Sequence, residues 1–394
     1  MNQRPAIPQE EFVSRQRQVQ DLLKELQLDL FIAYADDRAV FGPAHARWLF
    51  NYAPHFEPCC ILIPAEGEAV LLTGPESEAY VYATSYCRNV KVVSEFAHPD
   101  EEYPYAEVTS LERVVQQFRK QLDREIRNVG IAGMDSLPHK LYKAFRSMFG
   151  EEAMTEIEHH VTKLRAVKSE NEIRVIEYAY TIAEQGLQAA IRSIADGRTE
   201  REVAAEAEYA MRRLGSEGMG IDTIVASGVH NTHPILARTS LRAIRGGDLV
   251  LLTLAPRYEG YHGALGMTMV MGTPSKEVES AMEAATSALQ AAQEALRPGT
   301  AGRAVDRAAR QVIERAGLQN HFVYSGIHSI GVIEFEPPIL TSVYEDIIRE
   351  NMIFSIDIPL FFASWGGMRF ELGFHVTKDG ARPLQTVTPG MIRL

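Results

Sequence analysis

The region after residue 160 carries the same order of elements twice, and this repetition limits the possible folds more than any other feature. The first block predicts two helices over 170–193 and 199–214, then strands around 222–227, 248–256 and 261–271. The second block predicts two helices over 277–296 and 305–316, then strands around 322–333, 352–358 and 368–376. Two blocks of this kind predict one curved sheet with paired helices packed along it.

A capping box supports the second helix of the first block. Thr199 is followed three residues later by Glu202, and this spacing lets each side chain bond the backbone amide of the other residue. We therefore expect a helix to begin at this threonine.

The first 160 residues alternate shorter helical and strand patterns. Helical spacing covers 11–26, 107–122 and 140–148, and buried strands are predicted at 28–33, 60–64 and 129–132. A chain of 394 residues with 46% hydrophobic content can fill two cores. We expect an α+β protein with a smaller α/β domain over 1–160 and a catalytic domain over 161–394.

Net charge and cysteine spacing disfavour several classes of binding partner and metal site. The formal net charge of -12 disfavours binding to nucleic acid or to an anionic membrane, because phosphate binding needs clustered Lys and Arg. Cys59, Cys60 and Cys87 show no metal-ligand spacing, which suits reduced thiols. No apolar run approaches the roughly 18 residues of a membrane span, and no export signal is recognised. We expect a cytoplasmic protein with a small-molecule substrate.

The segment from Gly246 to Thr268 resembles the first metal-binding stretch of the aminopeptidase P, prolidase and creatinase family, which shares the pita-bread fold. The metallopeptidases of this family place two aspartates eleven residues apart in this stretch, and the aspartates bind two divalent ions. Here Thr253 and Ala264 stand at those positions. Neither side chain offers a carboxylate ligand, so we expect a member without that metal site.

Three further stretches align with the family and carry the remaining polar positions. The resemblance places His328 at the third ligand, and Asp357 and Glu371 at the last two acidic positions. It also places Phe335 where the metallopeptidases have a proton-donating histidine, just before Glu336. Phe335 and Glu336 are therefore counted among the residues that line the substrate site.

Creatinase is the family member that this chain resembles most closely. The resemblance rests on Ala264 and on the pair His328-Ser329. It implies cleavage of a carbon-nitrogen bond by a histidine that acts as acid and base, in a homodimer. Two positions depart from creatinase: Gly266 replaces a glutamate, and Glu57 replaces the arginine that binds the substrate carboxylate. The second change suggests that the substrate presents a cationic group to Glu57 across the dimer interface.

Two histidines compete for the acid and base role. His230 and His233 lie in one loop, and relatives place a functional histidine there. Imidazole suits this role because its pKa of about 6.5 lets it accept and donate a proton near neutrality. We favour His233 as catalytic and assign His230 to substrate binding, and the register between them stays open.

His328, Asp357 and Glu371 are the other predicted catalytic residues. The carboxylates would bind and orient a cationic or amide substrate. Two alternatives remain: the trio is a remnant of a lost metal site held by hydrogen bonds, or it still binds one metal ion. The remaining substrate-binding candidates are Arg238, Tyr261, His262, Glu336, Glu57 and Phe335.

These expectations combine into one function. We expect a metal-independent, creatinase-like hydrolase of a C–N bond in a small amide, amidine or guanidino compound, without a cofactor. The alternatives are a divergent metal-dependent Xaa-Pro aminopeptidase or dipeptidase, and a peptide-binding copy of the fold without activity. A metal assay separates the first two.

Overall fold

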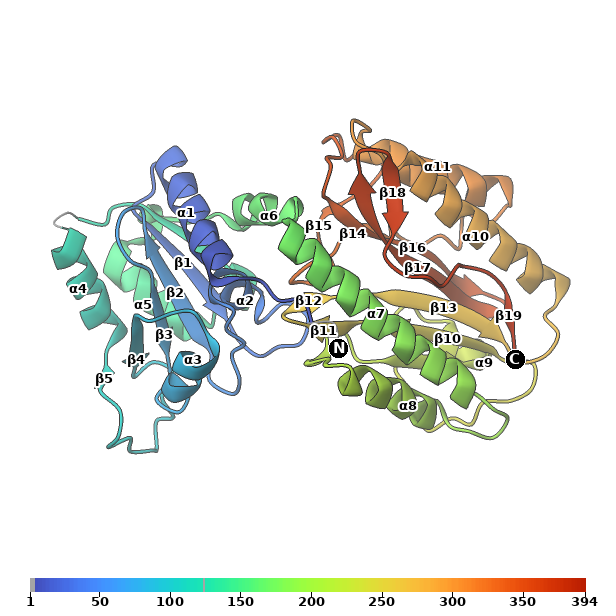
Figure 1. Cartoon of the computed structure of the whole chain (residues 1–394), viewed down its shortest axis with the longest axis horizontal. Coiled ribbons are helices and arrows are strands. Elements are labelled where there is room, and N and C mark those ends of the chain that lie inside the picture. Colours follow the sequence, from blue (N-terminus) through green and yellow to red (C-terminus); the bar gives the residue numbers. More distant parts are fainter. Residues whose placement is uncertain (1–3, 123–124) are drawn as a thin grey trace. The chain divides into compact units, whose positions relative to one another are not determined.

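The computed structural model describes residues 4–122 and 125–394, which form two compact units (Figure 1). The N-terminal unit spans Ile7–Arg165. The C-terminal unit spans Ala166–Leu394 and includes residues 4–6. Each unit has its own sheet.

A seven-stranded mixed sheet forms the N-terminal unit, in the order β5-β4-β3-β2-β1-β6-β7. Its strands are β1 Leu30–Ala35, β2 Cys59–Pro64, β3 Val70–Thr73, β4 Val90–Val93, β5 Val108–Thr109, β6 Val129–Ala132 and β7 Met154–Glu156. Its helices are α1 Gln9–Glu25, α2 Ala44–Phe50, α3 Glu78–Thr84, α4 Leu111–Leu122, α5 His139–Phe149 and α6 Glu158–Ala166, with short 3₁₀ turns at Met134–Ser136 and Glu151–Ala153. Strands β1 and β2 are buried along their whole length because both faces of the sheet are covered.

A nine-stranded sheet forms the centre of the C-terminal unit. Its main order is β15-β14-β16-β17-β13-β10-β9, with β18 beside β17 and β19 beside β13, while β12, β11 and β8 form a small separate sheet. The strands are β8 Gly218–Met219, β9 Ile224–Ser227, β10 Leu249–Leu254, β11 Pro256–Tyr258, β12 Tyr261–His262, β13 Leu265–Val270, β14 Ile327–Ser329, β15 Glu336–Ile339, β16 Ile353–Ala363, β17 Gly366–Thr377, β18 Gly380–Pro383 and β19 Ile392–Arg393. The helices are α7 Glu170–Ser193, α8 Glu200–Arg213, α9 Gly228–Thr232, α10 Lys276–Ala295 and α11 Gly302–Arg315.

The order of elements repeats as the sequence predicts. Helices α7 and α8 pack on each other and precede β8–β13, and helices α10 and α11 do the same before β14–β18. Figure 1 shows α7 and α8 in green beside β10 and β13, and α10 and α11 in orange beside β16 and β17. Each helix pair therefore packs beside one half of the same sheet.

Side-chain caps fix where these helices begin. The Thr199 hydroxyl accepts a hydrogen bond from the Glu202 amide, and the Glu202 carboxylate accepts one from Thr199, so the predicted capping box is confirmed. Ser169 and Glu172 form a second capping box at the start of α7. Both boxes satisfy amides that the first helical turn leaves without partners.

One predicted strand is shorter than expected. The sequence indicates a strand over 322–333, but the strand is limited to Ile327–Ser329, and before it only an isolated bridge joins Phe322 to Leu360 of β16. A register shift occurs between His328 and Ser329, and Gly331 then turns back so that its amide donates to the Ile333 carbonyl. The chain thereby leaves the sheet directly after Ser329.

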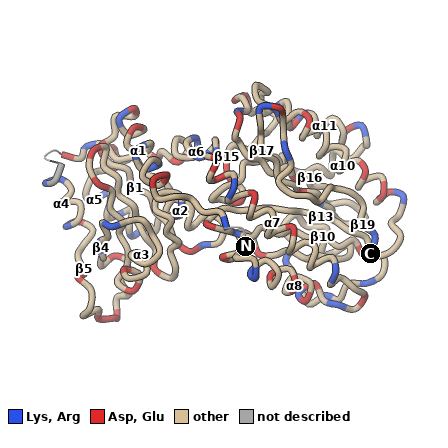
Figure 2. Tube along the Cα trace, in the orientation of Figure 1, with Lys and Arg blue, Asp and Glu red and all other residues tan. Residues whose placement is uncertain are grey.

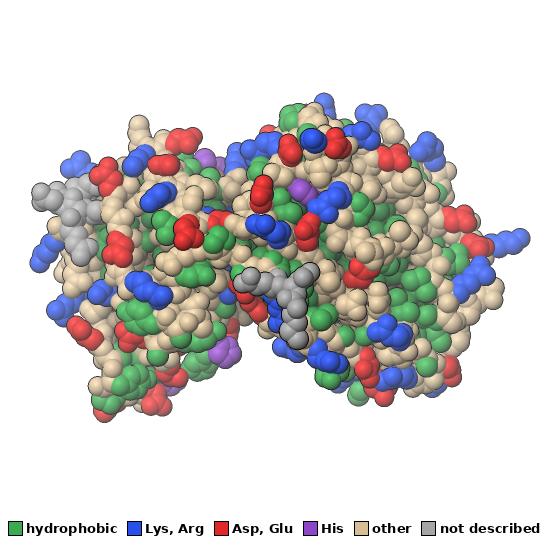
Figure 3. Space-filling view, viewed as in Figure 1, with side chains coloured by type: hydrophobic (Ala, Val, Ile, Leu, Met, Phe, Trp, Pro, Cys, Tyr) green, Lys and Arg blue, Asp and Glu red, His purple; other side chains and the backbone are tan. Residues whose placement is uncertain are grey.

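The surface carries both signs of charge. Lys and Arg alternate with Asp and Glu over both units in Figure 2, and Figure 3 shows them interspersed with hydrophobic side chains on this face. No helix among the described residues is long and apolar enough to cross a membrane.

Candidate functional site

Four neighbouring strands of the C-terminal sheet align the candidate residues in one row. Thr253 on β10 pairs with Gly266 on β13, Gly266 pairs with Glu371 on β17, and Glu371 pairs with Asp357 on β16. Directly opposite residues of antiparallel strands point to the same face of a sheet. The sheet therefore collects on one face residues that lie more than 100 positions apart in the sequence.

His328 enters this row from β14. It pairs with Ser355 on β16, and the Ser355 hydroxyl donates to Glu371 Oε1 at 2.8 Å. His328 Nδ1 lies 3.0 Å from the Ser329 carbonyl oxygen. Because a carbonyl can only accept, Nδ1 carries the hydrogen. The other ring nitrogen, Nε2, lies 3.7 Å from Glu371 Oε1, which is too long for a hydrogen bond.

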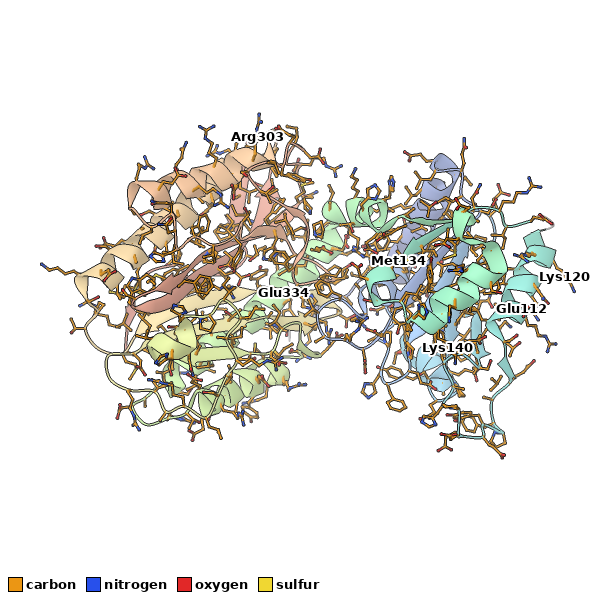
Figure 4. All side chains as sticks on the ribbon, turned by 180° about the vertical axis from the view of Figure 1, so that it is seen from behind. Glu112, Lys120, Met134, Lys140, Arg303 and Glu334 are labelled. Carbon is orange, nitrogen blue, oxygen red and sulfur yellow. The ribbon has the colours of Figure 1, made fainter. Side chains whose placement is uncertain are left out.

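Glu334 completes a cluster that the sequence does not predict. Its side chain is 3% exposed, and its Oε2 has no hydrogen-bond partner. One ligand atom each of His328, Glu334 and Glu371 lies within 4.8 Å of the others. Figure 4 shows Glu334 inside the C-terminal unit, whereas Arg303 projects from its surface. The signal in the sequence is one acid within an apolar run after β14.

The acids in this cluster disfavour each other's charge. Burial raises the pKa of Glu334 to about 7, and the nearby Glu371 adds to this effect. Burial would also raise the pKa of Glu371, but His328, Arg369 and Ser355 stabilise its charge and hold its pKa below the usual range. The two glutamates thus differ in how well the protein stabilises them.

Arg369 neutralises Asp357 at the other end of the row. Its Nε lies 3.2 Å from Asp357 Oδ2, its Nη2 donates to the Tyr324 hydroxyl at 2.5 Å, and that hydroxyl donates to Asp357 Oδ2 at 2.6 Å. Nη1 lies 3.3 Å from Thr253 Oγ1. Burial raises the pKa of Asp357 to about 6 even though Arg369 and Tyr324 stabilise its charge. Thr253 and Tyr324 therefore hold the guanidinium in place.

Gly266 makes room for this arginine. A Cβ at this position would lie 2.8 Å from the Glu371 Cβ and 2.9 Å from the Arg369 side chain. These distances are shorter than carbon atoms tolerate. The glycine therefore lets Arg369 lie across β13 towards Thr253.

His328, Asp357 and Glu371 are thus brought together, and two other predicted residues lie beside them. The Phe335 ring lies 4.1 Å from the His328 ring between centroids. Glu336 is buried and accepts an ion-pair contact from Lys168 at 2.9 Å. Phe335 packs on the imidazole of His328. Through its ion pair with Lys168, Glu336 links β15 to the segment before α7.

Tyr261 and His262 are buried and have partners outside the row. The Tyr261 hydroxyl donates to Glu172 Oε1 at 2.7 Å. His262 Nδ1 lies 3.0 Å from the Gly331 carbonyl, and burial lowers its pKa to about 3. His262 is therefore neutral, and both residues brace the segments around the site.

The two loop histidines lie on the short helix α9 and just after it. Both are exposed, and the His233 ring packs on Phe362 at 5.4 Å. The buried carboxylate of Glu200 anchors α9, because it accepts hydrogen bonds from the Ser227 and Asn231 side chains. This anchor positions both histidines, and their register stays open.

Arg238 and Glu57 have other partners. Arg238 is 88% exposed in its side chain and pairs with Asp222 at 3.2 Å. Glu57, predicted to contact a cationic group of the substrate across a dimer interface, is buried in the N-terminal unit and accepts hydrogen bonds from the Ser77 and Glu76 amides at 2.7 and 3.3 Å. Both of its oxygens are therefore engaged within that unit, because they cap the turn before α3.

A two-ion centre of the kind that the family resemblance implies does not fit these residues. Thr253 offers a hydroxyl already bonded to Arg369, Ala264 offers a methyl group, and Asp357 Oδ2 is engaged by Arg369 and Tyr324. Across the described residues, the one group of three acidic or imidazole side chains close enough to hold an ion is His328, Glu334 and Glu371. Residues for one ion are present.

Two family models match the chain. Residues 174–378 match the model of Metallopeptidase family M24, and residues 15–167 match the model of the Creatinase/Prolidase N-terminal domain. The predicted fold, a smaller N-terminal α/β domain followed in the sequence by a pita-bread catalytic domain, is confirmed.

Relatives with assigned names are peptidases. The Xaa-Pro dipeptidase of Pyrococcus horikoshii is 30% identical over 321 residues, which cover 82% of this chain and 87% of that protein. The Xaa-Pro dipeptidase of Pyrococcus furiosus is 29% identical over 321 residues, or 82% and 88% of the two chains. Among solved structures, the prolidase from Pyrococcus horikoshii superposes with a TM-score of 0.81 at 26% identity, covering 96% of this chain and 100% of that chain.

These relatives overturn the expected function. A metal-independent, creatinase-like hydrolase of a small amide, amidine or guanidino compound is the wrong prediction, because the relatives are named Xaa-Pro dipeptidases and the catalytic domain matches a metallopeptidase model. The error came from giving two substituted positions, Thr253 and Ala264, more weight than the similarity of the whole chain. The chain belongs to metallopeptidase family M24.

Proposed function

We propose that this chain hydrolyses the peptide bond of short peptides, and that Xaa-Pro dipeptides are its substrate class. The observation that carries the proposal is 30% identity to an Xaa-Pro dipeptidase over 82% of the chain. The two family models match residues 15–167 and 174–378, and these ranges include most of the N-terminal unit and the row of residues on the sheet.

The charges of the site support a substrate with a cationic end. Glu334, Asp357 and Glu371 are buried together, and Arg369 is the guanidinium that faces them. Three carboxyl groups against one fixed cation leave an excess of acidic groups. Such a site attracts the terminal ammonium of a peptide and repels a purely anionic compound.

The side chains around the row have separate tasks in this proposal. Ser355 orients the Glu371 carboxylate, and Arg369 with Tyr324 fixes Asp357 Oδ2. Asp357 Oδ1 has no hydrogen-bond partner, so it can accept a proton or an N–H from a bound peptide. A bound divalent cation would polarise the peptide carbonyl and acidify water in such a site.

The test measures free proline released from Ala-Pro and Leu-Pro, with Ala-Ala and Leu-Ala as matched peptides without proline. The purified full chain is assayed with and without added Mn²⁺, and Glu371→Gln serves as the inactive control. We expect proline release by the wild-type chain that exceeds release by the variant by on the order of 100-fold or more. Absence of proline release by a folded wild-type chain under all these conditions would reject the proposal.

A further inference from the structure

We propose that His328, Glu334 and Glu371 bind a single divalent cation, and that Glu334 supplies a ligand at a position to which the family resemblance assigns none. The proposal concerns ion binding alone. It therefore stands or falls separately from the proposed peptidase activity.

The distances fit a coordination shell better than a hydrogen bond. A charged imidazolium would hold a carboxylate oxygen at about 2.7–2.9 Å, but His328 Nε2 and Glu371 Oε1 are 3.7 Å apart. Two ligands that each lie about 2.1 Å from one ion, at tetrahedral or slightly wider angles, are about 3.4–3.6 Å apart. The third ligand atom, from Glu334, lies within 4.8 Å of both, so a side-chain movement on the order of 1 Å brings it into the shell.

The groups behind the ligands orient them towards the same point. His328 Nδ1–H donates to the Ser329 carbonyl, which leaves the Nε2 lone pair directed at the carboxylate. Ser355 donates to Glu371 Oε1. Metal-binding histidines and carboxylates are characteristically held by such outer hydrogen bonds.

Glu334 provides an independent sign of a missing partner. Its side chain is 3% exposed, and its Oε2 has no hydrogen bond. A buried carboxylate oxygen without a partner is costly, and native structures rarely leave one in that state. A cation between Glu334, Glu371 and His328 would satisfy it.

The other end of the row limits the site to one ion. Arg369 already contacts Asp357, and Thr253 with Tyr324 holds the guanidinium there. A second dication in this place would meet a fixed positive charge at short range. Asp357 therefore forms an ion pair with Arg369 and is not a ligand of the ion.

The donor set indicates the class of ion. One imidazole and two carboxylates suit Mn²⁺, Fe²⁺, Co²⁺ or Zn²⁺. Calcium prefers six to eight oxygen ligands, which this cluster does not provide. Mn²⁺ and Co²⁺ are the probes of choice, because the absorption of Co²⁺ also reports its coordination.

The experiment titrates chelator-treated full chain with Mn²⁺ and with Co²⁺ by calorimetry, and elemental analysis counts the ions retained after dialysis. We expect one ion per chain. Glu334→Gln, which keeps the shape and removes the charge, should weaken binding by at least about 100-fold, beyond the ~10- to 100-fold effect of losing an outer-shell partner. Asp357→Asn is the matched control, because it makes the same change in a neighbouring buried carboxylate and should weaken binding by less than about 10-fold.

Several outcomes would overturn the proposal: two ions per wild-type chain, no binding at millimolar Mn²⁺ or Co²⁺, equal affinity of wild type and Glu334→Gln, or a larger loss in Asp357→Asn. Circular dichroism of the ion-free variants checks folding, and Glu334→Asp, which keeps a carboxylate, should retain weaker binding. Binding of Ala-Pro to the ion-free chain that depends on Glu334 would assign the cluster to a substrate ammonium instead. Ion binding without proline release would reject the peptidase and leave this site intact.

Discussion

Each unit of the molecule contains a histidine beside a glutamate, and the two sites differ in how completely the protein satisfies their carboxylates. In the N-terminal unit, His45 Nε2 lies 3.1 Å from Glu158 Oε2. The same carboxylate accepts a hydrogen bond from the Gly133 amide at 2.9 Å and faces Arg165 at 3.4 Å. Burial would raise the pKa of Glu158, but these partners hold it well below its usual range.

The carboxylates of the C-terminal cluster lack this completeness. His328 and Glu371 are 3.7 Å apart, and Glu334 beside them leaves one oxygen without a partner. Both oxygens of Glu158 thus have partners in one unit, whereas the cluster in the other unit leaves a Glu334 oxygen without one. The comparison teaches that the number of partners around an acid, more than its residue type, separates a structural ion pair such as that of the partly exposed Glu158 from a binding site.

The largest expected effect comes from removing the acid of the open cluster. Glu371→Gln should reduce proline release by on the order of 100-fold or more, and it should lower the thermal unfolding temperature only slightly, because the lost contacts with Ser355 and Arg369 are partly offset by relief of the repulsion from the buried Glu334. Steady-state kinetics and calorimetry measure the two quantities. A large loss of stability would show that this acid is a structural group like Glu158.

Removing the acid of the closed pair should have the opposite pattern. Glu158→Gln should lower the free energy of unfolding by about 1–3 kcal/mol, because it weakens contacts with His45, Arg165 and Gly133. Activity per folded chain should stay within about twofold, since the change lies outside the proposed site.

The effect of Glu158→Gln should also depend on pH. The pKa of Glu158 is lower in the folded chain than the value of about 4.3 for an unfolded glutamate. Its stabilisation is therefore fully present above that unfolded value and is lost as the pH falls through the folded pKa. Urea unfolding should show the largest difference between wild type and variant near pH 7 and a shrinking difference below about pH 4. A difference that grows on acidification would contradict the assignment.

A smaller effect is expected from the network around Arg369. Tyr324→Phe removes the hydroxyl that donates to Asp357 and accepts from Arg369. We expect a loss of about 1–3 kcal/mol in unfolding free energy, because both partners are buried charged groups. The Mn²⁺ affinity should change by less than about 10-fold. A loss of ion binding as large as in Glu334→Gln would place Asp357 among the ligands.

The repeated plan of the C-terminal unit could be predicted from the sequence because local patterns encode it. Apolar periodicity placed the first helix over 170–193 as observed, and the capping box placed the start of α8. The strand at 322–333 was overestimated, since its apolar run continues beyond His328 while the backbone turns away at Gly331. Local hydrophobicity does not show where pairing stops.

The site was predictable only in part. His328, Asp357 and Glu371 lie on three strands, so no local pattern in the sequence groups them. The family resemblance predicted the group, and the pairing of the strands brings the three residues together. Glu334 was missed because its burial depends on the turn after β14. The burial of Glu57 could not be predicted for the related reason that it depends on the amides before α3. Long-range partners decide whether a charged residue is structural or functional, and a sequence pattern does not contain them.

The smallest effect is expected at Thr253, which separates the two ends of the row. Its Oγ1 lies 3.3 Å from Arg369 Nη1, a long hydrogen bond in a buried position. Thr253→Val keeps the shape and removes this acceptor, so we expect a loss of about 0.5–1.5 kcal/mol in unfolding free energy. Thr253→Ser keeps the hydroxyl and should lose less. Both variants should still bind one ion per chain, because the ligands lie at the other end of the row. If Thr253→Val lost the ion while remaining folded, the threonine would belong to the ion site, and the division of the row into an arginine end and an ion end would be wrong.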